Sequence, residues 1–113
     1  MSEKLAQLEK KGGGNIVGEY QTIETVTFSS GTTITRTVPK GSLVVLATSV
    51  GGGPYSIGSL VTPHVNLELV ASGPTRSSGN YILTGAFIAT DTNISFSTNS
   101  GAIFTAVISE RID

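Results

Sequence analysis

The chain has 113 residues, the length of a single domain, and because it contains no cysteine it can form neither a disulfide framework nor a thiolate metal site. Only 13% of the residues are charged, and a formal net charge of −1 gives no positive field that would attract a phosphate backbone. No stretch approaches the roughly 18 apolar residues of a membrane span, so composition predicts a protein that binds neither nucleic acid nor a membrane.

The first eleven residues, MSEKLAQLEKK, are richer in charge than the rest of the chain and have the pattern of a helix. Met1, Leu5 and Leu8 fall on one face of that helix, at i, i+4 and i+7. Three glycines follow, which end a helix and form a flexible joint. Such a short helix is not stable alone in water, so the segment is either a frayed tail or an arm that becomes ordered on a partner.

From residue 15 onward the pattern is that of β structure, with runs of Val, Ile, Thr and aromatic residues separated by clusters of Gly, Pro, Ser and Asn. The seven predicted strands are 16–28, 32–38, 43–49, 64–71, 81–89, 93–97 and 102–109. The first strand is predicted to contain a bulge, because Tyr20 and Ile23 are three residues apart whereas Val26 and Phe28 are two apart.

The spacing of apolar residues also predicts which faces the strands bury. Alternate residues from Val65 to Ala71 are expected on one buried face, and Ile94 and Phe96 are expected to point inward. The segments Leu43–Ala47 and Ala102–Ile108 are apolar at nearly every position, which predicts central strands covered on both sides. A monomeric sandwich covers only one face of each sheet, so these two strands suggest burial against another subunit.

These features predict an all-β protein, an antiparallel two-sheet sandwich of jelly-roll or immunoglobulin-like type with about seven strands, preceded by a short N-terminal helical arm. Residues 1–14 form the arm and glycine linker, and residues 15–113 form the β-sandwich domain. Residues 50–63 and 72–80 are predicted to be loops at the end of the sandwich, where ligand-binding residues usually lie.

The sequence offers little that could carry catalysis or bind a metal ion. His64 is the one histidine, and without cysteines it cannot complete a zinc site, which needs three or four ligands. No G-x-S-x-G motif supports a serine hydrolase. Glu19 and Glu24 would lie on opposite faces of a regular strand, and a bulge between them would change that. The glycines at 51–53 are not followed by the Lys-Ser/Thr pair of a phosphate-binding loop. We therefore predict no catalytic residue, no metal site, no cofactor and no enzymatic activity.

The order of features from residue 41 to residue 112 carries a resemblance. In chain order these features are the strand GSLVVL (41–46), the glycine run 51–53, a glycine-containing strand (81–89), the segment DTNISFS (91–97) and the alanine-rich strand AIFTAV (102–107). This order is similar to that of small β-sandwich modules in bacteriophage virion proteins and bacterial surface proteins. The N-terminal arm resembles the anchoring end of phage decoration, head-fibre and tail-fibre proteins, which are commonly trimers.

The resemblance implies a non-enzymatic structural protein of the virion, either a capsid decoration or cement protein or a head fibre, that forms a homotrimer. Its partner would be the major capsid protein or another virion protein, bound through residues 1–14 with Met1, Leu5 and Leu8 buried at the contact. The alternative is a receptor- or carbohydrate-binding module of a phage tail fibre or bacterial surface protein. Its ligand-binding residues would then be Tyr55, His64 and Arg76.

Overall fold

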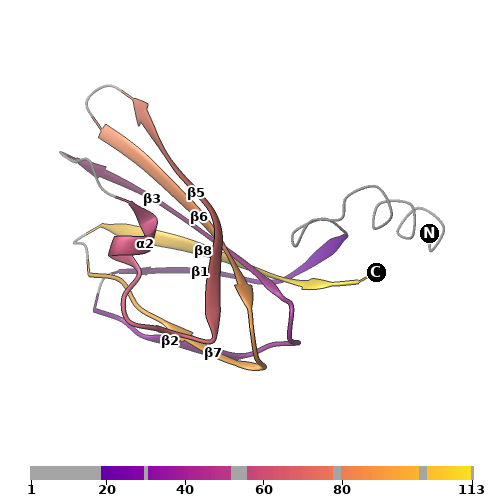
Figure 1. Ribbon diagram of the computed structural model, residues 1–113. Helices are drawn as coiled ribbons and strands as arrows, with labels where there is room; N and C mark the ends of the chain where they lie inside the picture. The colour runs from indigo at the N-terminus through magenta and orange to yellow at the C-terminus, as the bar shows by residue number, and fades with distance from the viewer. Residues whose placement is uncertain (1–18, 30, 52–55, 78–79, 100–101, 113) are drawn as a thin grey trace.

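The computed structural model describes residues 19–29, 31–51, 56–77, 80–99 and 102–112 (Figure 1). Its strands are β1 (Tyr20–Ser29), β2 (Ile34–Thr37), β3 (Leu43–Gly51), β4 (His64–Val65), β5 (Leu67–Ser77), β6 (Asn80–Ala89), β7 (Asn93–Phe96) and β8 (Ile103–Arg111), and the short helix α2 (Ile57–Leu60) lies between β3 and β4. The strands form an antiparallel five-stranded sheet with the order β1-β8-β3-β6-β5 and an antiparallel three-stranded sheet with the order β2-β7-β4. The prediction of a mostly β structure with two antiparallel sheets is confirmed for the described residues, and the predicted helical arm of residues 1–14 lies outside them.

The two sheets share one hydrophobic core. Phe28 of β1 lies with its ring centroid 5.7 Å from Phe96 of β7 and 5.7 Å from Phe104 of β8, so this aromatic cluster joins the large sheet to the small one. All four phenylalanines of the chain are buried, as is Ile94 of β7. Each fully buried side chain of this size stabilises the fold by roughly 1.5–3 kcal/mol. The prediction that Ile94 and Phe96 point inward is confirmed.

The prediction of one continuous strand over residues 64–71 is wrong, because the backbone turns at Asn66. This residue has φ +59, a left-handed conformation that Asn tolerates better than most residues. Its side-chain amide donates a hydrogen bond to the Asn93 carbonyl at 2.6 Å, and its own carbonyl accepts one from the Thr90 N–H at 2.9 Å. The turn sends β4 into the small sheet and β5 into the large one, so the described residues form eight strands.

The structure of the hairpin β5–β6 also differs from the one predicted from the sequence. Most of the segment 72–80, predicted to be a loop, lies in strands, because β5 continues to Ser77 and β6 begins at Asn80. Pro74 fits in β5 because this strand lies at the edge of the sheet, where one backbone N–H needs no partner. A bulge between Leu69 and Ala71 shifts the register, so the predicted alternation of inward residues ends there. Of the residues predicted to share one buried face, Leu67 is buried at 6% exposed, whereas Val65 is 50% exposed.

The bulge predicted in the first strand is confirmed, since the register between β1 and β8 shifts between Thr22 and Glu24. The segment between β3 and β4, predicted to be a loop, contains helix α2. Ser56 caps this helix, because its side-chain oxygen accepts a hydrogen bond from the Ser59 N–H at 3.3 Å. The helix buries Ile57 directly over Gly85 of β6.

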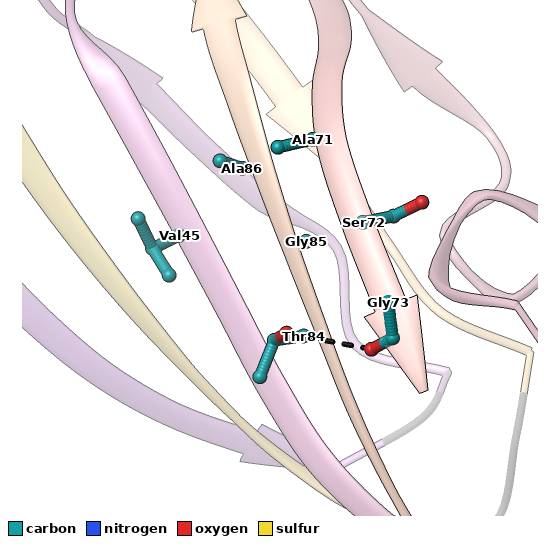
Figure 2. A pocket seen from close by; sticks show the side chains of 7 residues that line it. All are labelled: Val45, Ala71, Ser72, Gly73, Thr84, Gly85 and Ala86. Atoms are coloured by element: carbon teal, nitrogen blue, oxygen red, sulfur yellow. Dashed lines mark hydrogen bonds between the residues drawn. The ribbon is translucent and has the colours of Figure 1, made fainter. Parts of the chain in front are cut away.

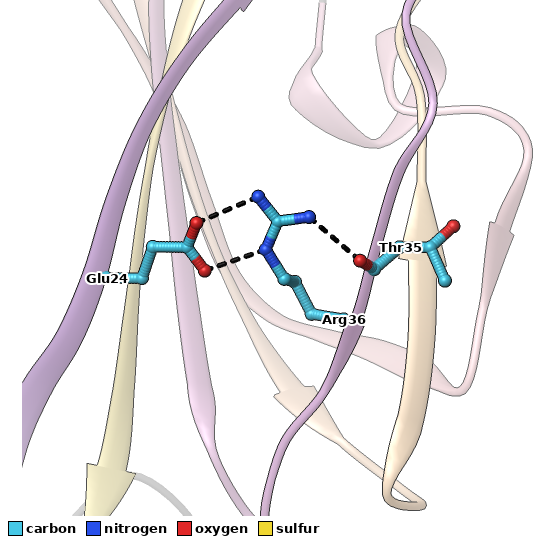
Figure 3. Close-up of polar contacts among 3 residues, drawn as sticks. All are labelled: Glu24, Thr35 and Arg36. Atoms are coloured by element: carbon cyan, nitrogen blue, oxygen red, sulfur yellow. Dashed lines mark hydrogen bonds and ion pairs between the residues drawn. The ribbon is translucent and has the colours of Figure 1, made fainter.

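An ion pair between β1 and β2 closes one edge of the sandwich (Figure 3). The Arg36 guanidinium donates to both carboxylate oxygens of Glu24, at 2.7 and 2.8 Å, and to the Thr35 carbonyl at 2.8 Å. These hydrogen bonds hold the pKa of the Glu24 carboxyl below its ordinary value and outweigh the opposing effect of desolvation. The pair thus ties the edge strand of one sheet to the edge strand of the other.

Candidate interaction surface

The large sheet has one face in the core and one face that none of the described strands or helices covers. We call the second the outer face, and define it by the residues of β3, β6 and β8 that alternate with the buried ones. They are Leu43, Val45, Ala47, Ser49, Ile82, Thr84, Ala86, Ile88, Ile103, Thr105 and Val107. The register places Val45 directly between Val107 and Ala86, so these side chains form rows across the sheet.

The outer face is mainly apolar, and in the edge strand β5 it carries the exposed carboxylate of Glu68, in register with Ile88. Eight of its eleven residues are aliphatic, and the other three are Ser49, Thr84 and Thr105. The described neighbours in the β1 rows, Thr25 and Thr27, are uncharged as well. Ile82 is 41% exposed and Ile103 is 67% exposed, while the remaining aliphatic residues of the face are half-buried. The outer face of an antiparallel sheet in a monomeric domain is ordinarily polar, so an aliphatic face of this extent is typical of an interaction surface.

The prediction that 43–47 and 102–108 lie in central strands is confirmed, because β3 and β8 each have a neighbour on both sides. That their second faces are covered by another subunit stays a prediction.

A shallow hollow of about 330 Å³ lies across β3, β6 and β5 and opens onto the outer face (Figure 2). Its lining consists of small residues and one valine: Val45, Ala71, Ser72, Gly73, Thr84, Gly85 and Ala86. At Gly73 a side chain would meet no atom within 4 Å, so the hollow exists because small residues fill these positions. Sequence analysis missed Ala71, because the β5 bulge moves it from the predicted inward face to the outer one, in register with Ala86.

The structure does not gather the residues predicted to bind a ligand. His64 lies in β4 of the small sheet, exposed, with its ring centroid 5.9 Å from that of Phe87. Arg76 lies in β5 of the large sheet, nine residues beyond the first residue of that strand, which is roughly 30 Å of extended chain. Tyr55 lies outside the described residues. So do the predicted anchor residues Met1, Leu5 and Leu8.

Within the described ranges, no three His, Asp or Glu side chains come together in a group that could hold a metal ion. No helix in that same part of the chain is long and apolar enough to cross a membrane. Comparison with known protein families, curated proteins and solved structures finds nothing that matches this chain. The function proposed for this protein therefore depends on its fold and on the outer face.

Proposed function

We propose that this protein is a non-enzymatic structural component of a phage virion, a capsid decoration or cement protein or a head fibre, that displays its β-sandwich and is anchored by residues 1–14. The observation that carries the proposal is the path of the chain, which alternates between the two sheets. Strands β1, β3, β6 and β8 belong to the large sheet and β2, β4 and β7 to the small one. This alternation is typical of jelly rolls, an architecture common in viral capsid proteins.

One strand departs from an even jelly roll. β5 stays in the large sheet beside β6 instead of extending the small sheet next to β4. The left-handed backbone of Asn66 accounts for this departure, because it redirects the chain between β4 and β5. We interpret the fold as a jelly roll with five and three strands in its two sheets.

The place where the N-terminal arm joins the sandwich supports an anchoring role. β1 is an edge strand, and Tyr20 at its start pairs with Arg111 near the end of β8. A segment joined at the end of an edge strand can reach a partner without disturbing the core. An apolar stripe of Met1, Leu5 and Leu8 would supply the buried contact.

The anchor is tested on virions of the virus that encodes the chain. Leu5→Asp combined with Leu8→Asp should abolish incorporation of the protein into purified particles and leave the circular dichroism of the sandwich unchanged. The matched control is Ala6→Asp with Gln7→Asp, which adds the same charge beside the apolar stripe and should preserve incorporation. Unchanged incorporation of the first variant would refute the anchor, and absence of the wild-type protein from purified virions would refute the virion function.

The alternative, a receptor- or carbohydrate-binding module, is tested on a glycan array. Jelly rolls also occur in lectins, but His64 and Arg76 lie in different sheets and do not form one site. Binding to a glycan that is lost in Tyr55→Ala would favour this alternative over the structural role.

A further inference from the structure

We propose that the outer face of the large sheet is a self-association surface, covered in the assembled protein by the same face of a second copy of this chain. The inference rests on the proposed function in one respect, which is that copies of a decoration or fibre protein meet on the particle. The choice of surface and of occupant rests on charge, area and shape.

The lack of charged side chains at the centre of the outer face favours a second copy of the chain as the partner that covers it. None of the eleven residues of the outer face in β3, β6 and β8 is ionisable, so the centre of the face offers no complement to a basic or acidic partner. Glu68 lies beside them in the edge strand β5, where its carboxylate can stay in contact with water at the rim of an interface. A partner that buries the centre of the face without leaving unpaired charges must itself present an uncharged, aliphatic surface. The same face of another copy meets this requirement, and contact between identical patches is the commonest way in which proteins form closed oligomers.

The area of the face is sufficient for a stable pair. The residues that define the face lie in three strands, and the flanking rows of β1 and β5 extend the same surface to five strands. With β3 nine residues long, about 4.8 Å between strands and about 3.3 Å per residue, all five strands give about 700 Å² per copy. Two copies would bury about 1,400 Å², within the range of about 1,200–2,000 Å² for stable, specific interfaces. Sheets pack face to face at about 10 Å, so no large rearrangement of either copy is needed.

The shape of the face is also self-complementary. Ile103 projects from β8, with 67% of its surface exposed, while the hollow of about 330 Å³ lies on the other side of β3, over β6 and β5. A two-fold axis in the plane between two copies can place Ile103 of each copy over the hollow of the other. Two copies are then the unit of assembly, in place of the three that the resemblance implies.

The N-terminal arm is too small to be the occupant. A helix over residues 1–11 would be about 16 Å long and about 10 Å wide, which is roughly a quarter of the face. Its apolar stripe consists of only three residues, and its other side chains include five charges.

The test is the native mass of the full-length protein, measured by light scattering and sedimentation over a range of concentrations. The wild type should have the mass of two chains. Thr84→Lys and Ile103→Lys each place an unpaired charge in the contact between Ile103 of one copy and the hollow of the other, and both positions are exposed, so the fold should tolerate them. Each should raise the dissociation constant at least about tenfold. The matched control Thr35→Lys, on the exposed side of β2 in the small sheet, should leave it unchanged.

Four results would overturn the proposal. They are a wild-type monomer at all concentrations, a trimer, a dimer that neither Thr84→Lys nor Ile103→Lys weakens, and a dimer that dissociates in Leu5→Asp with Leu8→Asp. The last result would assign self-association to the N-terminal arm. Incorporation into virions is a separate measurement, so a monomer that still enters particles would refute the self-association surface and leave the virion function standing.

Discussion

The contact between helix α2 and strand β6 makes a sharp prediction about Gly85. A Cβ atom at this position would overlap Cγ2 of Ile57 and would lie 3.0 Å from its Cγ1 and 3.2 Å from its Cβ. Ile57 is 1% exposed and packs in the core, so it cannot turn away into solvent. Gly85→Ala must therefore displace the helix from the sheet.

The size of the effect follows from two opposing contributions. Overpacking of this kind costs about 1–3 kcal/mol, whereas replacing a strand glycine by alanine otherwise contributes about 0.5–1 kcal/mol of stability. The expected net loss for Gly85→Ala is about 1–2 kcal/mol in the free energy of unfolding, measured by urea denaturation at fixed protein concentration.

The matched control is Gly73→Ala in the neighbouring strand β5. A Cβ at Gly73 would meet no atom within 4 Å, so this variant should gain about 0.5 kcal/mol from the reduced freedom of the unfolded chain. The two glycine variants are thus expected to have opposite signs. If Gly85→Ala proved as stable as Gly73→Ala, the position assigned to helix α2 would be wrong.

A double-mutant cycle identifies Ile57 as the cause. Ile57→Ala alone should cost about 2–5 kcal/mol. Combined with Gly85→Ala, the loss should be smaller than the two losses added together by about 1 kcal/mol or more, because the new methyl group occupies space that the isoleucine has vacated. Strict additivity would show that the two positions do not touch.

Two further predictions concern the edge and the turn of the sandwich. Because the Glu24 pKa is lowered in the fold, the Glu24–Arg36 pair stabilises the protein above the unfolded carboxyl pKa of about 4.3, and this contribution is lost as the pH falls through the folded pKa. The melting temperature of Glu24→Gln should therefore lie below that of the wild type at pH 7 and meet it in acid; a difference independent of pH would contradict this role. At the turn, Asn66→Gly keeps the left-handed backbone and loses only the 2.6 Å hydrogen bond, for an expected loss of about 1 kcal/mol. Asn66→Val adds backbone strain and should lose about 2–3 kcal/mol in urea denaturation; equal losses would contradict a left-handed requirement.

Local sequence patterns are sufficient to predict the features that depend on neighbours along the chain. Period-two spacing identified Ile94 and Phe96 as inward residues, and the break in that spacing at Ile23 located the bulge in β1. Two continuously apolar segments identified β3 and β8 as central strands. These predictions hold because side chains alternate between the two faces of a strand, so burial on one or both faces is recorded in the local pattern.

The sheet that each strand joins, and the residues that meet across the fold, depend on contacts between distant parts of the chain and are seen only in the three-dimensional structure. One residue, Asn66, divides a continuous β-like segment between two sheets, through a hydrogen bond to Asn93 that lies 27 positions away. The β5 bulge places Ala71 on the outer face, and helix α2 requires a glycine at position 85. None of these can be derived from periodicity, since each depends on a backbone conformation or contact set by residues distant in the chain.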